Sequence, residues 1–203
     1  MEQRMEQSLS VLIVLVLVWS CRGWEAPDFC HQQQCPQYQT ALWFCFVQGF
    51  EERLYVATDW ITTKVDSPED SDVMAAYSRL KHYCQRQKEA GNEIPTNTWP
   101  ALITVSEGEN GPDLSMSWFV PPGTTKPENT DPSVTVQSRP EATVYVRIFA
   151  GTPSISSGET NAKMLQEALD KAGKTFDPHT YTGAGYDSYL SITHHNEIWI
   201  YPA

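Results

Sequence analysis

Two stretches near the end of the chain decide the fold: Tyr181-Thr-Gly-Ala-Gly-Tyr-Asp-Ser188 and Asn196-Glu-Ile-Trp-Ile200. Both are short and rich in aromatic or β-branched residues, and they are predicted to be two strands that bracket a turn. Upstream, residues 143–149 (Thr-Val-Tyr-Val-Arg-Ile-Phe) alternate in polarity and predict another strand. A helix over 162–172, ended by Gly173, is expected between that strand and the hairpin. The order of the last third is therefore strand, helix, strand, strand.

These ordered segments resemble the SOUL heme-binding family. Its members carry a strand ending in Ala-Gly-Tyr-Asp or Ala-Gly-Tyr-Asn and a last strand beginning Asn-Glu-Val-Trp, which correspond to residues 184–187 and 196–199 here. The resemblance covers residues 48–201 and includes Arg53-Leu-Tyr55 and Trp60 in the first strand region. One departure lies at residues 93–102, which keep Ile-Pro but lack the family's Met-Thr-Ala core.

The chain also contains an internal duplication. Residues 116–122 align with residues 197–203 at a shift of 81, and the helix-ending glycines Gly91 and Gly173 align at a shift of 82. In the first half we expect a strand over 53–63, a helix over 73–90 and a hairpin over 102–120, and a proline-rich connector over 121–133. The predicted fold class is therefore α+β: two βαββ units forming a twisted or barrel-like antiparallel sheet flanked by two helices, as the SOUL resemblance also implies.

The N-terminus reads as a targeting segment. Residues 9–19 are almost wholly apolar and are followed by small residues up to Gly23, which predicts a signal peptide over 1–23. The apolar run is shorter than the ~20 residues that a membrane span needs. We therefore expect a secreted protein with a cysteine-containing extension over 24–47, a SOUL-like domain over 48–203, and no stable membrane association after cleavage.

Four cysteines remain after such cleavage: Cys30, Cys35, Cys45 and Cys84. In an oxidising compartment an even set predicts two disulfides, and the three possible pairings stay open. Because three of the four lie in or near the extension, at least one bond is expected to tie it to the first helix, which carries Cys84. A zinc site at Cys30 and Cys35 is the alternative that we disfavour, since the spacing is loose for structural zinc.

Composition narrows the function classes. The formal net charge is −11, with no run of lysine or arginine, which argues against nucleic acid as a partner. No phosphate-binding loop, nucleophile elbow or metal-binding helix motif occurs in the sequence. An enzyme is therefore not expected, and an extracellular protein partner remains open.

The resemblance implies heme or another porphyrin as the bound ligand. One branch of the family has a proposed histidine ligand after the arginine, but this chain has Leu54 there, so that ligand is not carried over. Other relatives use the first helix and the neighbouring hairpin loop, where cationic side chains could pair with the propionates. The corresponding candidates are Met74, Tyr77, Arg79, Lys81, Tyr189, His194 and His195. Met74 and Tyr77 also fit a core-facing helical stripe.

Two functions follow. The first is a secreted, non-catalytic carrier or scavenger of heme or a related tetrapyrrole. The second is a secreted module on the same fold that binds another protein or an apolar ligand instead, which Leu54 and the missing Met-Thr-Ala core favour.

Overall fold

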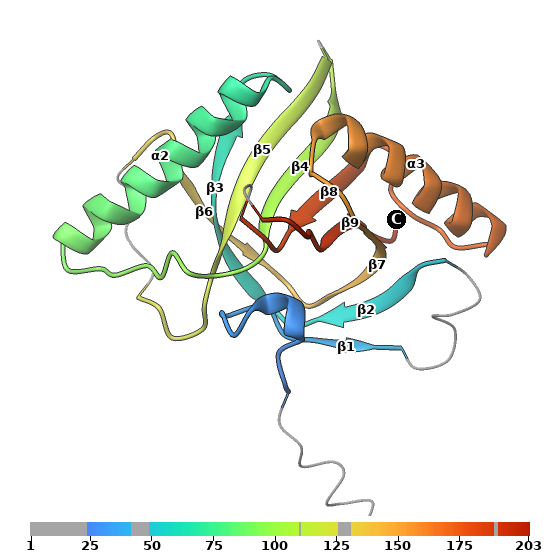
Figure 1. Ribbon diagram of the computed structural model, residues 1–203, viewed down its shortest axis with the longest axis horizontal. Coiled ribbons are helices and arrows are strands. Elements are labelled where there is room, and N and C mark those ends of the chain that lie inside the picture. The colour runs from blue at the N-terminus through green and yellow to red at the C-terminus, as the bar shows by residue number, and fades with distance from the viewer. Residues whose placement is uncertain (1–23, 42–48, 110, 126–130, 189–190) are drawn as a thin grey trace, which may run out of the picture.

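The computed structural model describes residues 24–41, 49–109, 111–125, 131–188 and 191–203 (Figure 1). A short 3-10 turn, Asp28–Cys30, precedes the sheet. The other elements follow in the order β1 (Tyr38–Thr40), β2 (Glu51–Tyr55), β3 (Thr58–Val65), α2 (Asp70–Glu89), β4 (Ala101–Gly108), β5 (Gly111–Val120), β6 (Thr135–Arg139), β7 (Ala142–Phe149), α3 (Ile155–Lys171), β8 (Thr180–Gly185) and β9 (Asn196–Ile200).

The nine strands form one curled antiparallel sheet in the order β1-β2-β7-β9-β8-β4-β5-β3-β6. The predicted duplication is confirmed, since β3-α2-β4-β5 and β7-α3-β8-β9 repeat the same plan. Each unit has one further strand before it, and these two strands are exchanged: β2 pairs with β7 of the second unit, and β6 pairs with β3 of the first. The two units meet where β4 pairs with β8.

Two predicted elements differ from the structure by more than a few residues. The strand expected over 53–63 is two strands, because the chain leaves β2 after Tyr55 and joins a different part of the sheet in β3. The second helix begins at Ile155 rather than Ala162. Its start is fixed by Ser154, whose hydroxyl accepts a hydrogen bond from the Ser157 amide at 3.0 Å while the Ser157 hydroxyl accepts one from the Ser154 amide. The first turns are mostly polar and so lack an apolar period.

The predicted helix ends are confirmed. Gly91 and Gly173 follow α2 and α3 with φ of 88° and 65°, a left-handed conformation that glycine adopts without a Cβ clash. The amides that follow them close the ends, because Asn92 donates to the Gln87 carbonyl and Lys174 donates to the Leu169 carbonyl.

The sheet has two different faces. Ile103, Gly183 and Ile198 are register partners across β4, β8 and β9, so their side chains share one face. Both helices pack on this face, with α2 over β3 and β5 and α3 over β7 and β9. The opposite, inner face holds a separate core that includes Trp60 and Trp199, with exposed fractions of 1% and 2%.

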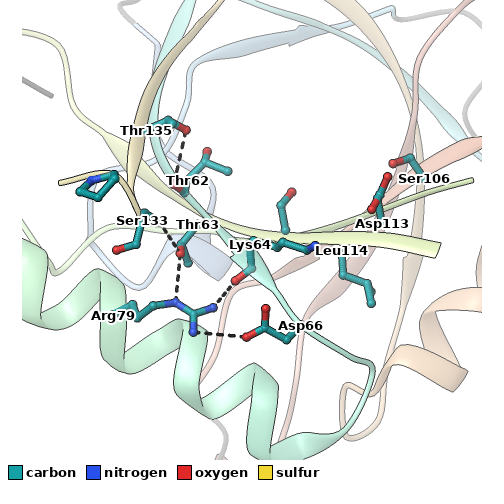
Figure 2. Close-up of a pocket in the computed structure, with 12 residues that line it drawn as sticks. Thr62, Thr63, Lys64, Asp66, Arg79, Ser106, Asp113, Leu114, Ser133 and Thr135 are labelled. Carbon is teal, nitrogen blue, oxygen red and sulfur yellow. Dashed lines mark hydrogen bonds and ion pairs between the residues drawn. The ribbon is translucent and has the colours of Figure 1, made fainter. Parts of the chain in front are cut away.

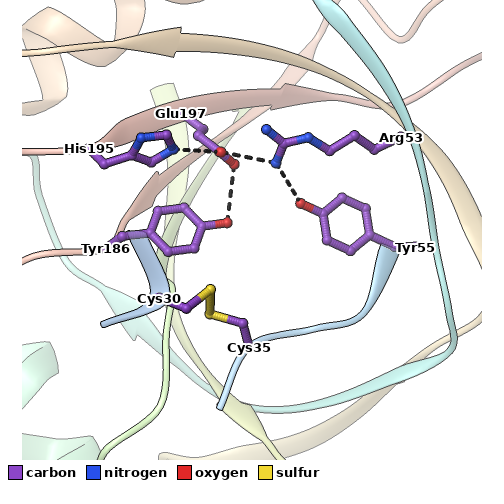
Figure 3. The surroundings of a disulfide bond; sticks show 7 residues. All are labelled: Cys30, Cys35, Arg53, Tyr55, Tyr186, His195 and Glu197. Carbon is purple, nitrogen blue, oxygen red and sulfur yellow. Dashed lines mark hydrogen bonds and ion pairs between the residues drawn. A yellow bond between two sulfur atoms is a disulfide. The ribbon is translucent and has the colours of Figure 1, made fainter. Parts of the chain in front are cut away.

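The N-terminal extension closes over the inner core. Cys30 and Cys35 form a disulfide, and both pack against Tyr55 and Tyr186 (Figure 3). Cys84 is a free thiol on the buried side of α2, in the other core, so the expected bond between the extension and this helix is not formed. The sheet lies between these two cores. Cys45 lies outside the described residues.

The segment predicted as a signal peptide, 1–23, also lies outside the described residues. Within the ranges given above, neither helix combines the length and apolarity needed to cross a membrane.

Candidate ligand-binding groove

A groove of about 450 Å³ opens between α2 and α3 on the helix-bearing face. Its floor is the junction of the two repeated units, with Ile103 and Val105 from β4 and Tyr181 and Gly183 from β8. The volume and the mainly apolar lining are those of small-molecule sites in general.

Two glycines leave the floor bare. Gly183 and Gly185 alternate along β8 on the groove side, and a Cβ added at either would come no closer than 3.8 Å to a neighbouring atom. The space above them belongs to the groove. Gly158 of α3 acts similarly in the wall, where the nearest atoms to an added Cβ are 3.7 Å away on Tyr181.

The walls present apolar side chains to the opening. Val73 and Met74 come from α2, and Ile155 begins α3 on the other side. Met74 is 58% exposed although it is apolar, so it gains buried area if a ligand enters. Burial, followed by the nearby carboxylate of Glu159, raises the pKa of Tyr181 to about 12, so its phenol is protonated at neutral pH.

The charged groups of the groove are all acidic. Asp70 and Asp187 line it, and no lysine, arginine or histidine is among the described residues that do. Glu197 also belongs to the lining, but its carboxylate lies on the inner face of the sheet. Asp187 accepts hydrogen bonds from His31 at 2.9 Å and from the His195 amide at 2.6 Å. The contact with His31 ties the N-terminal extension to the end of the groove, and the contact with His195 holds Asp187 to the last hairpin.

The predicted helix residues separate in the structure. Met74 lines the groove, whereas Tyr77 packs edge-on against Trp118 and is 43% exposed. Lys81 is exposed and does not line the groove. Arg79 points away from it, into a polar pocket of about 610 Å³ (Figure 2).

Arg79 makes three polar contacts in that pocket. Its Nε donates to the Thr63 hydroxyl at 3.2 Å, its Nη2 donates to the Lys64 carbonyl, and its Nη1 lies 3.6 Å from Asp66. Thr, Ser and Asp side chains make up most of the remaining lining. Arg79 therefore fixes α2 to the end of β3 and is not available to a ligand between the helices.

The predicted residues of the last hairpin also separate. Tyr189 lies outside the described residues. His194 is half-buried, and its Nδ1 has no hydrogen-bond partner within the described chain. The His195 ring stacks on Phe29 at 4.0 Å between centroids, and its Nε2 lies 2.8 Å from Glu197 Oε1. His195 thus belongs to the protein's own polar network.

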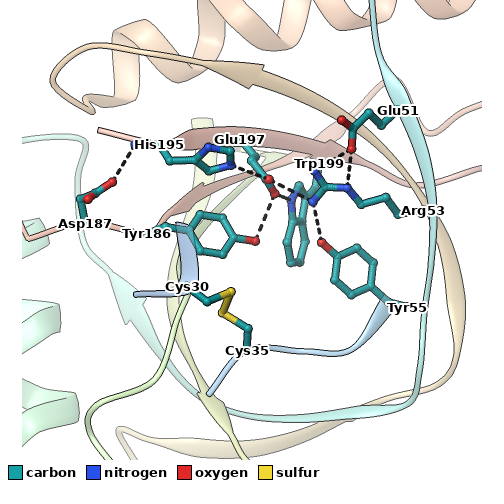
Figure 4. A network of polar contacts seen from close by, with 10 residues as sticks. All are labelled: Cys30, Cys35, Glu51, Arg53, Tyr55, Tyr186, Asp187, His195, Glu197 and Trp199. Atoms are coloured by element: carbon teal, nitrogen blue, oxygen red, sulfur yellow. Dashed lines mark hydrogen bonds and ion pairs between the residues drawn. A yellow bond between two sulfur atoms is a disulfide. The ribbon is translucent and has the colours of Figure 1, made fainter. Parts of the chain in front are cut away.

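That network is the feature that the sequence reasoning missed (Figure 4). It centres on Glu197, which is 0% exposed. Arg53 Nη1 donates to Oε1 at 3.0 Å, and the Tyr186 hydroxyl and Trp199 Nε1 donate to Oε2 at 3.1 and 2.7 Å. Arg53 is itself 1% exposed and also donates to Tyr55.

Electrostatics keeps this network charged. Burial opposes ionisation of Glu197, but the hydrogen bond from His195, the charge of Arg53 and the hydrogen bond from Trp199 outweigh it, so its pKa is lowered. Burial also opposes the charge of Arg53, yet Glu197 and its other neighbours raise the Arg53 pKa. Burial raises the pKa of Tyr186 well above its usual value. The arrangement is a saturated buried ion pair, which is suited to holding β2, β8 and β9 together.

Comparisons with known proteins match most of the chain. The sequence model of the SOUL heme-binding protein family matches residues 33–201. Human heme-binding protein 2 is 28% identical over 186 residues, covering 88% of this chain and 83% of its own, and mouse heme-binding protein 1 is 26% identical over 162 residues, covering 76% and 85%. The crystal structure of the EcmrR C-terminal domain shares the fold, with a TM-score of 0.50 at 14% identity over 81% of this chain and 96% of that one.

Proposed function

The chain belongs to the SOUL heme-binding protein family, and we propose that it binds heme or a related tetrapyrrole in the groove between α2 and α3. The observation that carries the proposal is the bared floor of the groove, where Gly183 and Gly185 leave a flat apolar strip between two helices. A planar macrocycle needs such a slot. The role is binding, and no catalytic step is proposed.

The residues present fit the apolar part of a heme. Bound heme supplies an iron that takes a nitrogen, sulfur or oxygen ligand from the protein. Met74 is the exposed groove residue that carries a sulfur ligand, and the protonated phenol of Tyr181 is the weaker candidate. Leu54, at the position where one branch of the family has a proposed histidine, lies on β2 and does not line the groove.

A hemin titration followed in the Soret region tests the proposal, with Gly183→Val as the blocking variant. A Cβ at position 183 makes an ordinary contact with the Ile103 carbonyl oxygen, at 3.8 Å, and the side chain extends into the groove. The apparent Kd is therefore expected to rise at least about tenfold, and circular dichroism checks that the variant is folded. Thr180→Val is the matched control, because Thr180 lies on the same strand but lines a separate cavity of about 330 Å³ on the inner face of the sheet, beside Trp60 and Trp199.

Saturable binding that Gly183→Val weakens and Thr180→Val leaves unchanged supports the groove. Equal binding by the unmodified protein and both variants would show that the ligand binds outside the groove. Absence of saturation above a free-hemin blank would refute heme binding and leave the alternative, a module that recognises a protein or a different apolar ligand.

We further propose that the protein is secreted and acts outside the cell as a carrier or scavenger, with residues 1–23 removed as a signal peptide. The apolar run over 9–19 supports this, as does the Cys30–Cys35 disulfide, because such bonds persist in oxidising compartments. Expression in cultured animal cells, with N-terminal sequencing of protein from the medium, tests it. A start near Trp24 is expected, and retention of residues 1–23 in a cell-associated protein would refute it.

A further inference from the structure

We infer that the groove selects its planar apolar ligand by charge: it favours uncharged or cationic substituents and disfavours carboxylates. This inference rests on the proposed function, since it assumes that the groove is the ligand site. It matters for heme itself, whose two propionates are negative.

The charged side chains that face the groove are all acidic. Asp70, the first residue of α2, is exposed at one side of the opening, and no hydrogen bond or ion pair is recorded for its side chain in the described structure. Asp187 stands at the hairpin end, held by His31. The carboxylate of Glu197 lies on the opposite face of the sheet, where it pairs with Arg53, so this pair presents no net charge to the groove. The whole chain carries −11, which adds to the same sign.

Three basic side chains near the groove bind other groups of the protein. Arg79 binds the end of β3, Arg147 donates to Asn161, and Lys163 pairs with Glu159 on α3. Lys81 is the exception, since no partner is recorded for it among the described residues. It stands seven residues beyond Met74 on α2, about 10 Å along the helix axis, outside the lining. Propionates could reach it only by leaving the groove.

The size of the effect follows from Coulomb's law. For two unit charges about 10 Å apart in a medium of effective dielectric constant ~40, repulsion weakens binding about fourfold. A dicarboxylate near Asp70 meets this penalty twice. Changing Asp70 to a cation reverses it, so the preference between a diacid and its neutral ester is expected to shift by at least about tenfold.

The experiment compares protoporphyrin IX with its dimethyl ester, which share one ring and differ in charge, by fluorescence titration of the purified protein. The variants are Asp70→Lys and, as the matched control, Glu89→Lys. Glu89 carries the same charge at the other end of α2, nineteen residues or about 28 Å away. A general effect of a variant on folding changes both Kd values alike and cancels in their ratio. The greater apolarity of the ester is the same for every variant and cancels when the ratios of the variants are compared.

The measured quantity is the Kd of the diacid divided by the Kd of the ester. In the unmodified protein we expect this ratio to exceed one and to fall as salt is raised. Asp70→Lys should lower that ratio at least about tenfold and Glu89→Lys should leave it within about twofold. A ratio that Asp70→Lys does not change, with both ligands still weakened by Gly183→Val, overturns charge selection and keeps the groove. Tighter binding of the diacid that Lys81→Gln abolishes also overturns it, in favour of propionate pairing with Lys81. Failure of both ligands to saturate would remove the proposed function itself.

Discussion

Replacing Glu197 by glutamine should destabilise the protein more than any change at an exposed acid. The carboxylate accepts four hydrogen bonds, two on each oxygen, from Arg53, His195, Tyr186 and Trp199. An amide has one acceptor oxygen, so its NH2 group must face two of these donors. The charge of Arg53 would also stay buried with its main partner lost, since its side chain is only 1% exposed.

Breaking one partner of such a buried pair costs about 3–5 kcal/mol. With a urea m-value of about 2 kcal/mol/M for a domain of this size, the unfolding midpoint of Glu197→Gln is expected to fall by about 1.5–2.5 M. Circular dichroism and tryptophan fluorescence should report the same transition, because Trp199 belongs to the network. An unchanged m-value would show that the loss is one of stability.

Glu51→Gln is the matched control. Glu51 also accepts a hydrogen bond from Arg53, at 2.8 Å, but its side chain is 29% exposed, so water can replace the contact. We expect a loss of about 1 kcal/mol or less. Equal losses for Glu51→Gln and Glu197→Gln, or a midpoint shift below about 0.5 M for the latter, would refute the view that Arg53 depends on Glu197.

The same pair predicts a pH dependence. Because the pKa of Glu197 is lowered in the folded state, its stabilisation is fully present above the ordinary carboxyl pKa near 4.3 and is lost as the pH falls through the folded value. The difference in unfolding free energy between the unmodified protein and Glu197→Gln should therefore shrink below about pH 4. A difference that grows on acidification would contradict this assignment.

The cysteines give the remaining predictions. Burial raises the pKa of Cys84 to about 11, so the folded protein holds this thiol in its unreactive form. In a Cys45→Ser background, an aromatic disulfide reagent should therefore modify Cys84 at pH 8 at least about a hundredfold faster in urea than in buffer. Comparable rates would show that α2 opens readily. Joint replacement of Cys30 and Cys35 by serine opens a loop of sequence separation 5 and should lower the unfolding free energy by about 2 kcal/mol, measured by urea titration. No change on this replacement would mean that the extension is held by packing alone.

The residues that made the family recognisable turn out to form one cluster. Arg53 and Tyr55 come from the first strand region, and Tyr186, Glu197 and Trp199 come from the two closing stretches, yet all five meet on the inner face. The available signal was the placement of an arginine and a glutamate of opposite charge at buried positions of two predicted strands. Their pairing could not be predicted because it depends on β2 joining β7, which brings together segments about ninety residues apart.

Local patterns were sufficient for elements whose cause is local. The glycines after both helices and the alternating strand β7 are of this kind. The first turns of α3 depend on side-chain capping at Ser154, and β6 depends on its pairing with β3, so an apolar period alone missed both. The candidate surface was mixed for the same reason: helical periodicity put Met74 and Arg79 on one helix but could not say that they face different pockets.

The groove is a product of the duplication and not of either unit. Its floor is the β4–β8 pair, where the two units meet, and its walls are α2 from one unit and α3 from the other. Because the two units lie side by side with their helices on the same face, a site at their junction receives one wall from each unit and is open between the two helices. The two halves contribute differently to the floor: β8 supplies glycines without side chains, and the neighbouring strand β4 supplies apolar side chains beside them. The N-terminal extension then reaches the end of the same groove through His31 and Asp187, so ligand affinity should respond to changes in the extension even though the sheet separates its disulfide from the helices.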